Sequence, residues 1–241
     1  MQHPDLPLFD ATVIACDVDT PHVTRLRVEL ADPQSLASFT TPGQYVALAP
    51  EGHPARWYVI ASRPADLPAL EFVIGRGAPI PEALCALGPG GRVRVSDAQG
   101  QGYPMARLRG RPLVAFVSGT GIAAVAPVVD ALLDEQGGEG IHVYQQERVR
   151  EEDPDAGSPC AFPLQSALAR WRAAGVRTVQ ACDASPVGAS AWVEALWGAD
   201  PDRPDPGSCE YLICGNAELE ERVGAALADA GVLTEQLHRN Y

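Results

Sequence analysis

The clearest candidate for chemistry is a short glycine turn near the middle of the chain. Ser118-Gly119-Thr120-Gly121 follows the unbroken apolar run Leu113–Val117, and apolar residues with helical spacing then cover Ile122–Leu133. Such a strand–turn–helix unit directs backbone N–H groups and a helix dipole at the turn, which favours a bound phosphate or pyrophosphate. A structural turn without a ligand is the alternative. A membrane span is disfavoured, because the glycine turn interrupts the run and Asp130 lies on the helix.

A second glycine turn has the same setting. Gly215-Asn216 follows the apolar run Tyr211–Cys214 and precedes the amphipathic segment Ala217–Ala230. The second half of the chain alternates between expected strands and helices, and the remaining ones are the strands Ile141–Tyr144 and Val176–Ala181 and the helices Pro163–Ala174 and Ala189–Trp197. This alternation predicts a Rossmann-like parallel α/β domain, in which ligands collect at the carboxyl ends of the strands.

The first half reads as an antiparallel Greek-key β-barrel. Short runs rich in Val, Leu and Tyr are separated by Pro, Gly and Asp, and they cover Ala11–Cys16, Val23–Leu30, Gln44–Leu48, Trp57–Ala61, Leu70–Ile74 and Arg92–Ser96. One short helix, Pro81–Leu87, interrupts them and ends at Gly88. We therefore expect a barrel domain over residues 1–108 and an α/β domain over residues 109–241, with linker segments at 100–104 and 109–112 and a cleft between the domains.

Composition narrows the class of protein. The 241 residues are 46% hydrophobic, which is enough for two buried cores, and the net charge of −13 disfavours nucleic acid and anionic membranes as partners. The first residues show no export signal, so a cytoplasmic location is expected. The six cysteines form no CxxC pair, so no metal site is expected.

Six motifs, in order, resemble those of the ferredoxin–NADP reductase superfamily. They run over most of the chain and are Thr41–Val46 (TPGQYV), Arg56–Ser62 (RWYVIAS), Gly75–Gly77 (GRG), Ser118–Ile122 (SGTGI), Leu212–Asn216 (LICGN) and the terminal Tyr241. The resemblance implies an FAD-binding barrel and an NAD(P)-binding α/β domain.

The resemblance also implies roles for individual residues on the flavin side. Arg56 would pair with the FAD pyrophosphate, since a guanidinium fork matches phosphate oxygens. Tyr58 would lie against the isoalloxazine ring, and Tyr241 would cover its other face. Gly77, Ala78 and the start of the helix at Pro81 would take the flavin phosphates through backbone N–H groups. The remaining flavin-side residues that the resemblance implies are Val59, Ser62, Ile74 and Gly75.

On the nicotinamide side, the resemblance implies a pyrophosphate site and a ring site. The pyrophosphate would lie on Gly119, Thr120, Gly121 and Ile122. Cys214, Gly215 and Asn216 would edge the nicotinamide, and Cys214 joins Tyr58 and Tyr241 as a candidate catalytic residue. An ordinary buried thiol is the alternative for Cys214.

Cofactor preference is expected to follow from Asp183. Superfamily members that use NADP place basic residues after the corresponding strand, whereas this chain has Cys182-Asp183-Ala184-Ser185-Pro186. A carboxylate repels a 2′-phosphate and accepts from a ribose hydroxyl, so NADH is favoured over NADPH. Arg148 or Arg150 would reverse this preference if the acidic loop Arg148–Ser158 folds back toward the dinucleotide.

The expected function is that of an FAD-dependent oxidoreductase. Hydride would pass from NAD(P)H to the flavin, and electrons would continue to free flavin, a ferric chelate, a quinone or a redox protein. Three departures from the superfamily pattern, Val59 for a hydroxyl residue, Pro81 for Ser or Thr and Arg239 for a glutamate, motivate one alternative, a non-catalytic scaffold protein. The other alternative is an electron-transfer subunit of a larger complex.

Overall fold

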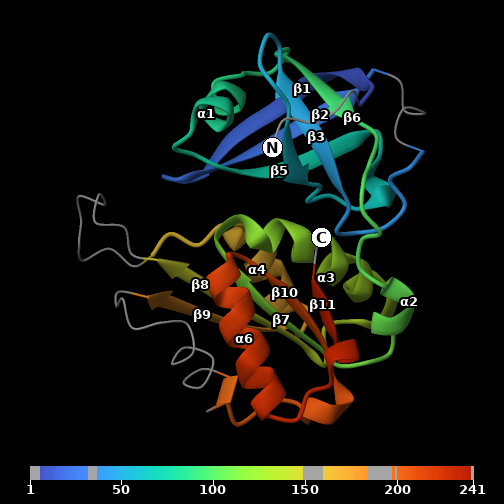
Figure 1. The fold of residues 1–241 in the computed structure, drawn as a ribbon, viewed down its shortest axis with the longest axis vertical. Helices are drawn as coiled ribbons and strands as arrows, with labels where there is room; N and C mark the ends of the chain where they lie inside the picture. The colour runs from blue at the N-terminus through green and yellow to red at the C-terminus, as the bar shows by residue number, and fades with distance from the viewer. Residues whose placement is uncertain (1–5, 32–36, 149–159, 184–196, 199, 240–241) are drawn as a thin grey trace.

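The computed structural model describes residues 6–31, 37–148, 160–183, 197–198 and 200–239. Two sheets lie one above the other in Figure 1, the first built from the N-terminal half and the second from the C-terminal half. The expected helix Ala189–Trp197, apart from its last residue, lies outside the described residues. The terminal Tyr241 does as well.

The N-terminal sheet is antiparallel and has the strand order β4-β3-β6-β1-β2-β5. Its strands are β1 (Leu8–Thr20), β2 (Val23–Leu30), β3 (Tyr45–Pro50), β4 (Arg56–Val59), β5 (Ala69–Gly75) and β6 (Arg92–Ser96). Each falls within a few residues of its predicted position, and β1 is longer than predicted because it pairs with both β2 and β6.

Hydrogen bonds beside the two edge strands, β4 and β5, close the sheet into a barrel. Just after β4, the Ala61 N–H donates to the Glu71 carbonyl of β5 at 2.8 Å, and the Glu71 N–H donates to Ser62 Oγ at 3.0 Å. Alternate residues of the strands fill the interior, with Leu26, Leu48 and Phe72 fully buried. Helix α1 (Pro79–Cys85) covers one end of this core, and it begins two residues before the predicted Pro81.

The segment between the two sheets contains an unpredicted helix. The one-turn helix α2 (Met105–Leu108) lies between the two predicted linker segments, 100–104 and 109–112, in a stretch for which no helix was predicted. Met105 and Leu108 are buried against the C-terminal half. The domain boundary expected after residue 108 stays a prediction.

The C-terminal sheet is parallel and has the strand order β11-β10-β7-β8-β9. Its strands are β7 (Leu113–Ser118), β8 (Ile141–Arg148), β9 (Arg177–Asp183), β10 (Glu210–Cys214) and β11 (Leu237–Arg239), and its helices are α3 (Ile122–Gln136), α4 (Gln165–Ala173) and α6 (Ala217–Asp229). Strand β11 was not predicted, because three residues are too few for a periodic signal.

Helices cover both faces of this sheet. Along β7, Leu113, Ala115 and Val117 pack with α3 and α4, whereas Val114 and Phe116 pack with α6. Figure 1 shows α6 crossing one face of the sheet. This two-faced burial explains the unbroken apolar run in the sequence, and the barrel followed by a parallel α/β sheet confirms the predicted fold class.

The two halves share one apolar core at their junction. Val23 of β2 and Val73 of β5 belong to the same buried cluster as Ile122 of α3, and Val59 packs against that cluster. Hydrophobic contact therefore fixes the face of the barrel that meets the carboxyl end of the parallel sheet.

Candidate functional site

A cleft of about 710 Å³ lies between the barrel and the carboxyl end of the parallel sheet. It brings together eight of the predicted site residues from both halves of the chain, namely Val59, Gly75, Gly119, Thr120, Gly121, Cys214, Gly215 and Asn216. The two predicted glycine turns and Val59 of the predicted flavin motif thus line a single hollow.

The first glycine turn forms the floor of the cleft. Residues Gly119–Gly121 make a 3-10 turn that leads directly into α3. Gly119 has a φ of +54°, and a Cβ placed there would meet no atom within 4 Å, so a ligand can approach its backbone closely. At Gly121 a Cβ would lie 2.3 Å from the Cys214 carbonyl oxygen. Only glycine therefore allows the turn to pack on the end of β10.

The second turn places Cys214 at the edge of the cleft. Burial, reinforced by the nearby Glu220 carboxylate, raises the pKa of the Cys214 thiol to about 12. The sulfur is therefore a neutral thiol at physiological pH. The Asn216 side chain accepts the Leu219 N–H at 2.8 Å and caps α6, so its side chain has a structural task whatever binds nearby.

The predicted flavin residues lie along β4. Arg56 is exposed, and Tyr58 packs edge-to-face on Phe72 with ring centroids 6.5 Å apart. The Tyr58 hydroxyl is buried and has no hydrogen-bond partner among the described residues. Burial raises the pKa of Tyr58 to about 12, against the opposing effect of the Arg56 guanidinium. A buried hydroxyl without a partner is a candidate for ligand contact.

The loop before α1 is already bound to a carboxylate. Glu82 Oε1 accepts the Gly77 N–H at 2.8 Å, and its other oxygen lies 3.1 Å from the Arg76 guanidinium. These contacts, with Arg76 first, lower the pKa of Glu82. The first turn of α1 also contains Pro79 and Pro81, which lack an N–H. A phosphate at this predicted site would therefore compete with Glu82.

Three predicted residues serve the fold instead of lining the cleft. Ile74 is buried in the barrel core and Ile122 in the junction core, so only their backbone is available. Ser62 Oγ accepts the Glu71 N–H and helps close the barrel.

Asp183 ends β9, but its side chain lies outside the described residues. The preference for NADH therefore stays a prediction.

Several cleft residues were missed by sequence reasoning. They are Thr20, His22, Val23, Gln146, Glu147 and Ala161, whereas Ser118, which also lines the cleft, was part of the predicted glycine turn. Gln146 and Glu147 could have been found, because they end β8 at the same sheet edge as the glycine turns. Thr20 and His22 could not, because they lie at the end of β1 and in the turn that follows it. Only the fold brings this turn beside Gly75, where the Arg76 N–H donates to the His22 carbonyl at 2.9 Å.

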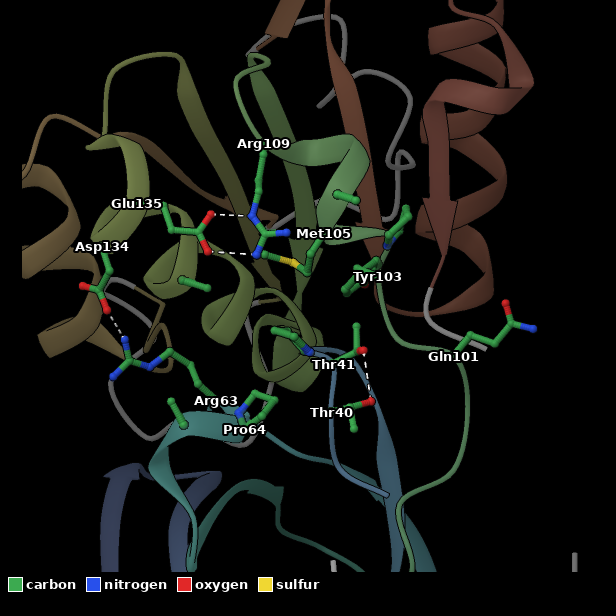
Figure 2. Close-up of a pocket in the computed structure, with 15 residues that line it drawn as sticks. Thr40, Thr41, Arg63, Pro64, Gln101, Tyr103, Met105, Arg109, Asp134 and Glu135 are labelled. Atoms are coloured by element: carbon green, nitrogen blue, oxygen red, sulfur yellow. Dashed lines mark hydrogen bonds and ion pairs between the residues drawn. The ribbon is translucent and has the colours of Figure 1, made fainter. Parts of the chain in front are cut away.

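A second hollow of about 650 Å³ lies elsewhere at the junction, lined by the barrel loops, the linker and the end of α3. Figure 2 shows Arg63 paired with Asp134 and Arg109 paired with Glu135 on its walls. Because these charged side chains pair with one another, the hollow has less positive charge available for an anionic cofactor than the backbone N–H groups of the cleft provide.

Within the described residues there is no group of three or more His, Cys, Asp or Glu that could hold a metal ion. No described helix combines the length and apolarity needed to span a bilayer.

A barrel of the flavin-binding type followed by a dinucleotide-type α/β sheet is an architecture that this chain shares with known reductases. A curated relative is the ferredoxin–NAD(P)+ reductase component of a naphthalene 1,2-dioxygenase/salicylate 5-hydroxylase system from Ralstonia sp.. It is 28% identical over 236 residues, which cover 96% of this chain and 68% of the relative. No family model matches the chain.

Solved structures show the same fold. A ferredoxin NADP+ reductase from Neisseria gonorrhoeae with bound FAD and NADP superposes with a TM-score of 0.72 at 19% identity, covering 98% of each chain. A phthalate dioxygenase reductase superposes with a TM-score of 0.72 at 14% identity, covering 96% of this chain and 67% of that one. These findings confirm the predicted resemblance to the ferredoxin–NADP reductase superfamily and its two-domain fold.

Proposed function

We propose that this chain is an NAD(P)H-dependent flavin oxidoreductase that takes hydride from a nicotinamide dinucleotide, with NADH favoured, and passes electrons to a separate acceptor. The observation that carries the proposal is the cleft, in which the Gly119–Gly121 turn and Cys214 face Val59 and Gly75 of the barrel. Hydride transfer requires two rings held in contact, and a cleft shared by two nucleotide-type domains supports that arrangement.

The C-terminal half fits a dinucleotide. The open backbone at Gly119 and the start of α3 suit a pyrophosphate, which helix N-termini bind through N–H groups and the dipole. Cys214, as a neutral thiol, would contact the nicotinamide ring without placing a charge beside it. The tight packing of Gly121 on β10 keeps the two contact points at a fixed separation.

The barrel fits a flavin ring better than it fits the flavin phosphates. The buried Tyr58 hydroxyl is available to a polar group of the cofactor, and the exposed Arg56 is available to a phosphate. The Gly77 N–H must first be released by Glu82. Bound FAD would supply the hydride and electron chemistry, which the side chains of the cleft lack.

A specific observation favours a redox protein as the electron acceptor. The Ralstonia relative is named as the reductase component of a dioxygenase and hydroxylase system, and this chain spans 68% of its length. We propose that the chain likewise acts as one component of such an electron-transfer system. The net charge of −13 favours an acceptor with a basic or neutral docking face. The cytoplasmic location expected from the sequence stays a prediction.

A visible spectrum tests the proposal. The purified chain is reconstituted with FAD, freed of unbound cofactor, and titrated anaerobically with NADH and, separately, with NADPH. A yellow protein that bleaches with NADH at lower concentration than with NADPH supports the proposal and its cofactor preference. A yellow protein that NADPH bleaches first contradicts the preference alone. A colourless protein that ignores FAD supports the scaffold alternative.

A further inference from the structure

Two cysteines from distant parts of the sequence meet beside the cleft. The Cys160 N–H donates to the Cys182 sulfur at 3.1 Å, and the Cys160 thiol donates to the Glu147 carbonyl at 3.8 Å. Glu147 is also the neighbour of Cys182 in the β8–β9 ladder. Glu147 and Ala161 line the cleft, so the two cysteines adjoin residues of its wall on the carboxyl side of the parallel sheet.

The two thiols differ in environment. Cys182 is exposed and Cys160 is half-buried, and neither is in a disulfide. Burial, followed by a hydrogen bond with the Cys182 sulfur, raises the pKa of the Cys160 thiol to about 12. Oxidants from solvent therefore reach the Cys182 sulfur first. Cys160 is held next to Cys182, where it can react with the oxidised sulfur.

We propose that Cys160 and Cys182 are a redox-modification site, in which peroxides convert the two thiols into an intramolecular disulfide. The Cys182 thiol loses its proton, and the thiolate attacks one peroxide oxygen, which breaks the O–O bond and gives a sulfenic acid and hydroxide. The hydroxide takes up the released proton and becomes water. The Cys160 sulfur then attacks the sulfenic sulfur, forms the S–S bond and releases a second water. Two thiols lose two electrons and two protons in total, and hydrogen peroxide becomes two molecules of water.

A second cysteine pair in the barrel provides a matched comparison. The Cys16 thiol donates to the Cys85 carbonyl at 3.4 Å, and both residues are half-buried. This pair lacks an exposed member for the first oxidation step. The proposal therefore predicts that peroxide links Cys160 to Cys182 before it links Cys16 to Cys85.

Peptide mapping tests the linkage on the full chain. Cleavage after arginine separates the two cysteines, because Cys160 lies between Arg150 and Arg170 and Cys182 follows Arg177. The reduced protein is treated with hydrogen peroxide at a small excess, the remaining thiols are blocked, and the peptides are identified by mass spectrometry without reduction. A Cys160–Cys182 peptide pair that disappears on reduction supports the site. Its absence, or a dominant link between other cysteines, overturns the proposal.

Single substitutions identify the order of the steps. In Cys160→Ser the oxidation should stop at Cys182, which gains one or two oxygens and forms no link. In Cys182→Ser, Cys160 should remain largely reduced, because the first thiol to react is missing. The exposed position of Cys182 makes that variant safe for folding, and Cys16→Ser is the control that should leave the link unchanged. Oxidation of Cys160 at the wild-type rate in Cys182→Ser would contradict the order.

One consequence rests on the proposed function. A bond across the end of β8 would tie the segment at Cys160 to the end of β9, where the dinucleotide is expected to enter. We expect peroxide to raise the KM for NADH on the order of tenfold in the wild type, which corresponds to the loss of one good contact with the dinucleotide. In Cys182→Ser, peroxide should leave the KM unchanged. A mapped disulfide with an unchanged KM would contradict this consequence. A reduced protein that never oxidises NADH would instead contradict the proposed function and leave the disulfide standing.

Discussion

At the scale of single residues, the candidate site is defined by backbone shape and by two unusual side chains. Gly119 and Gly121 provide opposite properties, open space at one position and tight contact at the other. Cys214 provides a half-buried neutral thiol, and Glu82 places a carboxylate where the sequence predicted a phosphate. The properties of Glu82 and Cys214 can each be tested on the single residue.

Glu82 is expected to compete with the flavin phosphates. Glu82→Gln removes the charge that pairs with Arg76 and weakens the contact with the Gly77 N–H, so a phosphate meets less competition there. We expect the Kd for FAD to fall about threefold to tenfold, as the gain of part of a charge-assisted contact would give. Fluorescence titration of FAD measures this change, and Glu51→Gln, in an exposed turn, is the control. An unchanged or higher Kd would show that Glu82 lies clear of the phosphate path.

Cys214 is expected to resist alkylation at ordinary pH. Its thiol pKa is raised to about 12, so the reactive thiolate is present only at roughly one part in ten thousand at pH 8. Raising the pH should increase its labelling by iodoacetamide about tenfold per unit up to the limit of protein stability. Mass spectrometry of timed samples measures the rate, and the exposed Cys182 is the internal comparison. Labelling of Cys214 as fast as Cys182 at pH 8 would contradict the assignment.

At the scale of elements, the site depends on how turns and strands of the parallel sheet are locked together. The glycine turn at the start of α3 contacts the end of β10, and that end carries Cys214. At the opposite edge, the buried Glu210 at the start of β10 holds the linker helix α2 and strand β11. Contacts at both ends therefore fix β10.

Gly121→Ala is expected to separate α3 from β10. The added Cβ would lie 2.3 Å from the Cys214 carbonyl oxygen and 2.8 Å from its carbon, and both are backbone atoms that cannot turn away. We expect a loss of about 2 kcal/mol or more in the free energy of unfolding, as for overpacking of a tight contact. Urea unfolding measures it. Gly88→Ala, where a Cβ meets nothing within 4 Å, should stay within about 0.5 kcal/mol of wild type.

Glu210 is expected to stabilise the junction of α2, β10 and β11 in its charged form. Its carboxylate is fully buried and lies 3.0 Å from Arg107, 2.8 Å from Arg111 and 2.7 Å from His238. Burial alone would raise its pKa, but the hydrogen bonds from His238 and Arg107 outweigh burial and lower it. Glu210→Gln should therefore cost about 3 kcal/mol of unfolding free energy, the lower end for breaking a buried ion pair.

The pH dependence of that contribution has a definite sign. Because the folded-state pKa of Glu210 is lowered, its contribution is complete above the unfolded-state pKa and is lost as the pH falls through the folded-state value. The difference in unfolding free energy between wild type and Glu210→Gln should shrink in acid. Urea unfolding at pH 7 and at decreasing pH measures this, with the exposed Glu235→Gln as the control. A difference that stays constant into acid would contradict the role of the charged form.

At the scale of the whole molecule, the two halves are held by apolar contact more than by charge. The junction core includes Val73 from the barrel and Ile122 from α3. The ion pair between Arg63 and Asp134 also spans the junction, but the Asp134 side chain is 68% exposed. Water and salt screen such a pair, whereas the apolar core is screened by neither.

Two substitutions separate these contributions. Val73→Ala should cost about 2 kcal/mol of unfolding free energy through lost burial and a residual cavity. Asp134→Asn should cost less than about 1 kcal/mol, and that loss should disappear in about 1 M salt. Urea unfolding of both variants at low and high salt measures the costs. A larger cost for Asp134→Asn than for Val73→Ala would show that charge holds the halves together.

Much of the fold could be predicted from the sequence because its signals are local. The buried strand Leu113–Ser118, the helix that begins at Ile122 and the alternation of the barrel strands depend on the periodicity of apolar residues. The glycine turns were found because each directly follows an apolar run and directly precedes a helical pattern. Helix α2 and strand β11 were missed, because one turn and three residues are too short for a periodic signal.

The sequence alone determined which residues could form turns, strands and a phosphate-binding backbone, because these properties depend on neighbours along the chain. Only the tertiary structure decided which of those turns share a cleft, that Glu82 occupies the Gly77 N–H, and that Cys160 meets Cys182 across 22 positions. Those outcomes depend on sheet register and on packing between the halves. Contacts of that kind are set by the fold as a whole, and short stretches of sequence carry no record of them.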